Sequence, residues 1–146
     1  MHQILAFIIS RMAFLWESAK FKIVDSEVSV SNGGDALLVV ESKVLRMRFV
    51  RDRGQLLLDL QPVSASGVEW YSIDLIRRLL TGVPETSSLL DESYSDFLCD
   101  HMSEIEGRFV PGAWSESRAS LERLKELRFR QMFGGVHGTE TPDANS

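Results

Sequence analysis

The sequence predicts an α+β fold, with an N-terminal helix, an antiparallel meander sheet of three or four strands, and about three helices packed on the sheet. Two observations carry this prediction. Apolar residues recur at helical spacing before residue 17 and after residue 70, and they alternate with a period of two between residues 21 and 60. The connections between the alternating segments are too short for the crossover that parallel strands need, so neighbouring strands should be antiparallel. The 146 residues predict one domain, 1–133, followed by a tail, 134–146.

The N-terminal helix is expected to be amphipathic and to dock on the core. Arg11 interrupts its apolar run, which leaves the run short of the ~18 to 20 uncharged residues that a membrane span requires. The run also lacks the positively charged start and the small-residue cleavage site of a signal peptide. Its apolar face is nevertheless wide, so a homodimer contact or attachment to a membrane surface stays open. The apolar residues are Ile4, Phe7, Ile8, Met12, Leu15 and Trp16.

The first hairpin of the sheet is predicted over residues 21–42. FKIVDSEVSVS alternates, and ALLVVES follows it as a strongly apolar strand. Asn32-Gly33-Gly34 joins the two strands, because these residues tolerate positive φ angles. The sequence leaves open whether residues 36–51 form one long bent strand or two. The apolar side of the first strand is formed by Val24, Val28 and Val30.

A second hairpin is predicted in KVLRMRFVRDRGQLLLDLQP, which turns at residues 51–54. Arg46 and Arg48 share one face of its first strand. Arginines on an exposed sheet face usually pair with acids across the strands, and Glu41 and Asp59 are the candidates here. The residues expected to face the core are Leu45, Met47, Phe49, Leu56, Leu58 and Leu60.

Helical spacing of apolar residues returns in three segments of the second half of the chain. Serine residues precede two of these helices and glycine residues follow all three, as is typical of helix caps. The tail after the last helix has little to bury and is expected to be disordered. The predicted bounds are Ser72 to Gly82, Tyr94 to Gly107, and Ser115 or Ser117 to Gly134-Gly135.

The acidic residues are concentrated in one segment. Residues 85–106 hold seven of the 21 acids and no Lys or Arg, although the net charge of the whole chain is only −5. Like charges four residues apart destabilise a helix by roughly 0.2–0.5 kcal/mol per pair, so such a row works against local stability. The acids that follow one another at this spacing are Glu92, Asp96, Asp100 and Glu104.

Two interpretations of this acidic segment stay open. In the first, it is a solvated face that pairs with the last predicted helix, through Arg118, Arg123, Lys125, Arg128 and Arg130. In the second, it is an electrostatic docking face for a basic protein partner. The residues that would contact the partner are Glu92, Asp96, Asp100 and Glu104 as steering charges, with Tyr94 as an anchor. Nucleic acid is not expected as a partner, because the carboxylates would repel phosphates.

No pattern in the sequence assigns an enzymatic activity. GxSxG, HExxH and Walker motifs are absent, as is the ligand spacing of a metal site, and no cofactor is expected. Cys99 and His101 lie two residues apart on a predicted helix and therefore face different directions, which excludes a Cys–His nucleophile pair. Cys99 is expected to be a small buried hydrophobe, and a single cysteine fits a reducing compartment.

The order of elements resembles that of small bacterial immunity proteins, which neutralise secreted toxins. The segments that carry the resemblance are the leading helix, the RFVRDRGQLLLDLQP hairpin, the EWYSIDLIRRLL segment and the acidic residues 85–106. The resemblance covers most of residues 10–133. It implies a non-enzymatic cytoplasmic protein that binds a toxin domain, often a basic nuclease, and blocks its active site. A carboxylate-rich face would then imitate nucleic acid electrostatically.

The function predicted from the sequence is therefore a non-enzymatic protein-binding module, an immunity-type inhibitor that docks a basic partner through residues 85–106. One alternative is a homo-oligomeric structural or regulatory protein that associates through the apolar N-terminal helix. A second alternative is an enzyme with a carboxylate site between the sheet and the helices.

Overall fold

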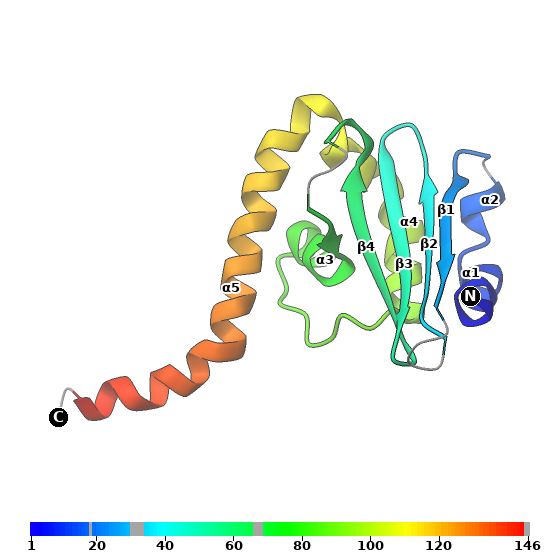
Figure 1. Ribbon diagram of the computed structural model, residues 1–146. Helices are drawn as coiled ribbons and strands as arrows, with labels where there is room; N and C mark the ends of the chain where they lie inside the picture. Colours follow the sequence, from blue (N-terminus) through cyan, green and yellow to red (C-terminus); the bar gives the residue numbers. More distant parts are fainter. Residues whose placement is uncertain (18, 30–33, 66–68, 145–146) are drawn as a thin grey trace.

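The computed structural model confirms the α+β class (Figure 1). It describes residues 1–17, 19–29, 34–65 and 69–144, with side chains described up to residue 133. The elements are α1 (His2–Arg11), α2 (Phe14–Glu17), β1 (Lys22–Val28), β2 (Ala36–Glu41), β3 (Leu45–Asp52), β4 (Gln55–Pro62), the 3-10 turn η2 (Val63–Ala65), β5 (Tyr71–Ser72), α3 (Ile73–Thr81), α4 (Glu92–Phe109) and α5 (Pro111–Ala144).

The sheet has five strands in the order β1-β2-β3-β4-β5, each antiparallel to the next. The strand beyond the predicted number is β5, whose two residues are too few to show an alternating pattern. Residues 36–51 form two strands, because the hydroxyl of Ser42 accepts hydrogen bonds from the backbone N–H groups of Val44 and Leu45, at 3.3 and 3.0 Å, and so turns the chain. The predicted turn residues Asn32 and Gly33 lie outside the described residues.

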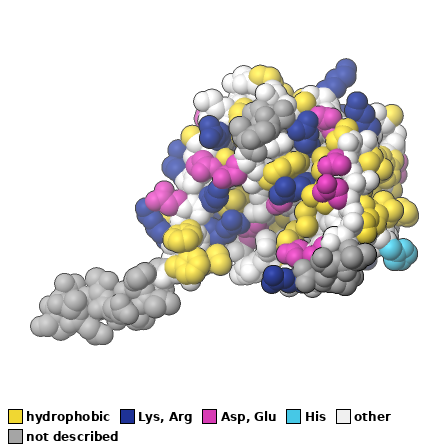
Figure 2. All heavy atoms as spheres, viewed as in Figure 1, with side chains coloured by type: hydrophobic (Ala, Val, Ile, Leu, Met, Phe, Trp, Pro, Cys, Tyr) yellow, Lys and Arg dark blue, Asp and Glu magenta, His cyan; other side chains and the backbone are white. Residues whose placement is uncertain are grey.

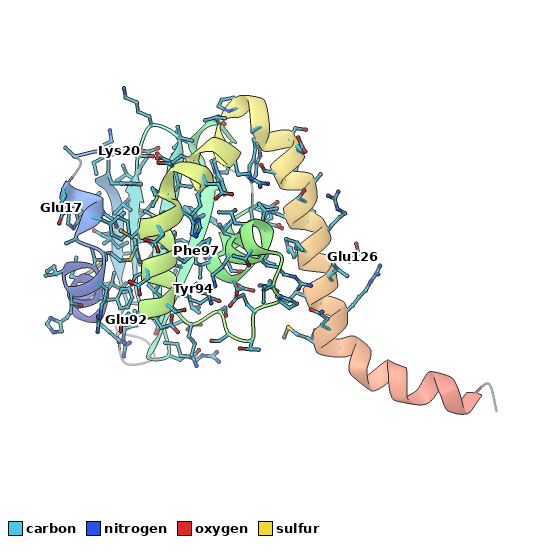
Figure 3. All side chains as sticks on the ribbon, turned by 180° about the vertical axis from the view of Figure 1, so that it is seen from behind. Glu17, Lys20, Glu92, Tyr94, Phe97 and Glu126 are labelled. Carbon is cyan, nitrogen blue, oxygen red and sulfur yellow. The ribbon has the colours of Figure 1, made fainter. Side chains whose placement is uncertain are left out.

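The two faces of the sheet have different roles. α4 lies behind the sheet in Figure 1 and in front of it in the reverse view of Figure 3, so it covers one face. On the other face Arg46 pairs with Glu41 at 2.8 Å and Arg48 pairs with Asp59 at 2.7 Å, as the sequence predicts. The face under α4 holds the predicted core side chains, with Leu56 partly buried and the others fully buried: Leu45, Met47, Phe49, Leu58 and Leu60.

The helices begin and end where local chemistry allows. α3 ends at Gly82, which has the predicted left-handed conformation with a φ of +76°. α4 passes through Gly107 and ends at Phe109, because Pro111 disfavours the helical conformation at Val110. Pro111 is well suited to the first turn of a helix, where its missing N–H is not needed.

α5 is longer than predicted at both ends. It starts at Pro111, before Ser115, and it continues past Gly134 to Ala144. The division of the chain into a domain 1–133 and a tail 134–146 stays a prediction. Within the described residues, no helix is long and apolar enough to cross a membrane.

Candidate functional site: the exposed face of helix α4

The side chains of α4 divide into a buried face and an exposed face. The buried face packs against the sheet and the other helices and consists of Tyr94, Ser95, Phe97, Leu98, Ile105 and Phe109. Because a helix turns once every 3.6 residues, the positions between these face outward. They form a polar stripe that consists of Asp96, Cys99, Asp100, Ser103 and Glu104, all exposed.

We call Glu92, Asp96, Asp100 and Glu104 the acidic row. Its two central carboxylates have no ion pair and no hydrogen bond within the described part of the chain. Glu92 forms an ion pair with Arg11 at 3.0 Å, but 61% of its side chain stays exposed. Glu104 lies 3.5 Å from Nδ1 of His101, a contact that is ionic only when the histidine is protonated. The ion pairs within the chain therefore leave most of the charge of the row available to a partner.

The row is about 18 Å long, because its ends are twelve residues apart on a helix that rises about 1.5 Å per residue. Neighbouring carboxylates along it are separated by about 6 Å at their Cβ atoms. Such a row can attract several cationic side chains of a partner at once. Neither the burial nor the fixed donors that turn a carboxyl group into a general acid are present at these exposed positions.

Tyr94, the predicted anchor, is not part of this surface. Only 1% of it is exposed, and its hydroxyl donates a hydrogen bond to the backbone carbonyl of Ser87. The guanidinium of Arg77 lies 3.9 Å above its ring. Burial, followed by the charge of Glu85, raises the pKa of the Tyr94 hydroxyl far above its ordinary value, so the group stays neutral. A side chain held in this way cannot reach a partner. The prediction that Tyr94 anchors a partner is therefore wrong.

The other acids of residues 85–106 hold the fold together. Glu85 forms two charged hydrogen bonds with Arg77 of α3, at 2.9 and 2.5 Å, and this pair is largely buried. Asp91 caps α4, because its side chain accepts a hydrogen bond from the backbone N–H of Tyr94 at 3.1 Å. Glu106 pairs with Lys20 at 2.7 Å. These acids are therefore structural, and the charge available to a partner is that of the acidic row.

The predicted alternative, pairing of the acidic segment with the basic residues of α5, is wrong for the described residues. Lys125 pairs with Glu69, Arg128 with Asp74 at 2.8 Å, and Arg130 with Glu126 at 2.6 Å. α5 packs against α3 and meets α4 near the turn at Val110 that joins the two helices (Figure 1). Its cations therefore face other parts of the molecule. The cations that do neutralise the acidic segment come from α1, α3 and Lys20. Arg11 and Lys20 are distant from their acids in the sequence, whereas Arg77 is 8 residues from Glu85.

Cys99 is exposed, and the prediction of a buried cysteine is wrong. It lies three residues after Asp96 and one before Asp100, so it shares the outward face of α4. Its spacing from the acids could have shown this, because residues three and four apart on a helix are neighbours. The chain thus has a single thiol in the middle of the acidic row.

No group of three or more His, Cys, Asp or Glu side chains among the described residues is arranged to hold a metal ion. Among the described residues, one carboxylate oxygen, Oδ1 of Asp74, is buried without a hydrogen-bond partner. The other oxygen of Asp74 accepts from Arg128, so this carboxylate is held in an ion pair between α3 and α5.

No family model, no curated protein and no solved structure matches this chain. The functional conclusion therefore rests on the chemistry of the surface itself.

Proposed function

We propose that the protein is a non-enzymatic protein-binding module that docks a basic protein partner through the acidic row. The observation that carries this proposal is the exposure of Asp96 and Asp100 without a cation of their own among the described residues. Each adds a like charge to its neighbours along the helix and so costs local stability. A basic partner would offset this repulsion with favourable ion pairs, whereas water alone would leave the repulsion in place.

The row would act mainly on the rate of association. Exposed charges of one sign steer an oppositely charged partner and raise the association rate constant, while they add less to the affinity of the final complex. The effect extends over a Debye length, about 8 Å at physiological ionic strength, so it should weaken as salt is added. The buried face of α4 fixes the helix, so the carboxylates already lie in one line before the partner binds. Less entropy is therefore lost when the complex forms.

In its finer form, the proposal is an immunity-type inhibitor that acts in the cytoplasm on a basic toxin domain. The support for this form is the resemblance of residues 10–133 to bacterial immunity proteins, together with the row of carboxylates. If the toxin domain were a nuclease, the row would occupy the surface that otherwise binds phosphates. Inhibition would then follow from exclusion of the nucleic acid, without any chemical step on the inhibitor.

The test is capture of proteins from a lysate of the source cell with the wild-type chain and with a neutral-row variant, Asp96→Asn, Asp100→Asn and Glu104→Gln. The matched control removes three exposed acids elsewhere, Glu17→Gln, Asp52→Asn and Glu116→Gln, and so has the same net charge. Capture is repeated at low salt and at about 0.5 M salt, where the Debye length falls to a few Å.

A basic protein retained by the wild type and the control, lost by the neutral-row variant and weakened by salt is the expected result. Retention of the same protein by the neutral-row variant would contradict the proposal. Coupling of a bulky maleimide to Cys99 gives an independent check, because it covers the row without changing any acid. A C99S chain that carries the same label at Ser115→Cys, an exposed position on α5 outside the row, is the control.

A further inference from the structure

β1 is the edge strand at one end of the sheet. Only β2 pairs with it, and no described residue forms a hydrogen bond to the backbone groups on its outer side. All seven of its residues are exposed. Three of them are large and apolar, with Ile23 53%, Val24 42% and Val28 66% exposed. An unpaired edge of this length is a template for another strand, unless it is protected.

The neighbouring helices add apolar surface to this edge. α1 and α2 lie at the β1 end of the sheet, and both Figure 1 and the reverse view in Figure 3 show them there. Ile9 is 70% exposed, and Leu5 and Trp16 are exposed as well. Arg11 points to α4 through its ion pair with Glu92, whereas Leu5 and Ile9 lie on a different side of the same helix. Figure 2 shows hydrophobic side chains gathered over this end of the molecule.

We infer that β1 pairs antiparallel with β1 of a second copy of this chain, so that the sheet continues across a twofold axis. This inference goes beyond the docking function proposed for α4, because it uses a different surface. Main-chain hydrogen bonds between the two edge strands would supply the pairing. The apolar residues of α1, α2 and β1 would add the contact area that a seven-residue strand alone does not provide.

The bulge in β1 decides which charges meet across such an axis. Ile23 stands opposite Val40 and Asp25 opposite Val39, so Val24 is an extra residue. In a regular strand, Lys22 would share a face with Val24, Ser26 and Val28. Because of the bulge, it shares the face instead with Asp25 and Glu27. The pairing with β2 shows this, because Lys22, Asp25 and Glu27 stand opposite Glu41, Val39 and Leu37. These three residues of β2 alternate with the core residues Ala36, Leu38 and Val40, so they share the face that points away from the core.

Residues opposite each other in an antiparallel pair must lie on the same face of the sheet. A symmetric junction can therefore set Lys22 of one copy opposite Glu27 or opposite Asp25 of the other. In both registers a cation meets an acid, twice in each dimer because of the symmetry. The register with Glu27 also brings the Asp25 side chains of the two copies opposite each other at the axis, so the register with Asp25 is the more favourable one. None of the three charges has an ion pair within the described residues. This charge complementarity favours a second copy over an unrelated strand.

The test is the mass of the full chain in solution, measured by sedimentation equilibrium over a range of concentrations. The expected species at high concentration has twice the 16.5 kDa mass of the chain. Ile23→Lys should shift the mass to that of the single chain, because Ile23 lies within the paired segment in both registers and the change places a charge on the apolar part of the edge. Val83→Lys is the matched control, since Val83 is similarly exposed, at 59%, but lies after α3. Removal of α1 is not a useful test, because Ile4 and Ile8 are buried in the core.

A charge exchange identifies the register. Lys22→Glu alone should favour the monomer, because it places like charges opposite each other. Combination with Glu27→Lys should restore the dimer if Lys22 faces Glu27, and combination with Asp25→Lys should restore it if Lys22 faces Asp25. A monomer at every concentration, a dimer that survives Ile23→Lys, or a failure of both exchanges to restore the dimer would each overturn the inference. None of these outcomes affects the docking proposal, since every variant leaves α4 unchanged.

Discussion

Replacement of Asp100 by the neutral residue Asn should make the protein more stable. It has a like charge four residues before it, Asp96, and another four residues after it, Glu104. Each such pair destabilises a helix by about 0.2–0.5 kcal/mol, so Asp100→Asn should raise the free energy of unfolding by about 0.4–1 kcal/mol. No hydrogen bond or ion pair within the described residues is lost, and Asn and Asp have similar helix propensities. For a domain of this size the melting temperature should rise by about 1–4 °C.

The assay is urea unfolding followed by circular dichroism, at low salt and at about 0.5 M salt. The stabilisation by Asp100→Asn should shrink at high salt, because the repulsion between exposed charges is screened. Glu116→Gln is the control, since Glu116 is an exposed helical acid with no charged residue three or four positions away, and it should change stability little. A variant at Asp100 that is no more stable than the wild type at low salt would refute the reasoning, because it would mean that the row is already neutralised within the chain.

Three further predictions follow from the same contacts. Arg77→Met should lower the free energy of unfolding by about 2–4 kcal/mol in urea titrations, because it leaves the largely buried carboxylate of Glu85 without its cation; an unchanged midpoint would contradict the role of this pair. Cys99 should react with a thiol reagent in the folded protein as fast as in urea, and strong protection would contradict its exposure. Burial and the hydrogen bond to Glu122 raise the pKa of Tyr71 from 10.0 to about 12, so its contribution to stability should be complete below pH 10 and lost as the pH rises through 12. The difference between the wild type and Tyr71→Phe in alkaline unfolding measures that contribution, and a difference that does not change with pH would contradict it.

The faces of the sheet could be predicted from the sequence because they depend on a local rule. Successive side chains of a strand point to opposite faces, so the positions of Leu45, Met47 and Phe49 in the core follow once the strand is recognised. The cross-strand pairs of Arg46 and Arg48 follow from the hairpin register in the same way. The apolar spacing of Tyr94 with Phe97 and Leu98 also indicated burial, and the favoured role of tyrosine at interfaces was the wrong guide to it.

The ion pairs of the acidic segment could not be predicted in this way. They depend on how α1 and α3 pack beside α4, and the sequence does not state this packing. Arg11 and Lys20 are 81 and 86 residues from their acids, whereas the basic residues of α5 are closer in the sequence but turned toward other elements. Arg77 is 8 residues from Glu85, but the pair forms only because α3 packs beside α4. The bulge at Val24 is a similar case, because only the pairing of β1 with β2 shows that Lys22 and Glu27 share a face.

The central claim, that the acidic row steers a basic partner, is tested most directly by association kinetics. The association rate constant of the captured partner should be measured as a function of ionic strength for the wild type and for Asp96→Lys with Asp100→Lys. We predict a wild-type rate constant that falls steeply as salt is added, and a variant rate constant that is lower at low salt and nearly independent of salt. Circular dichroism of the variant controls for folding. Equal rate constants with equal salt dependence for the two proteins would contradict the claim and leave the acidic row as a solvated surface.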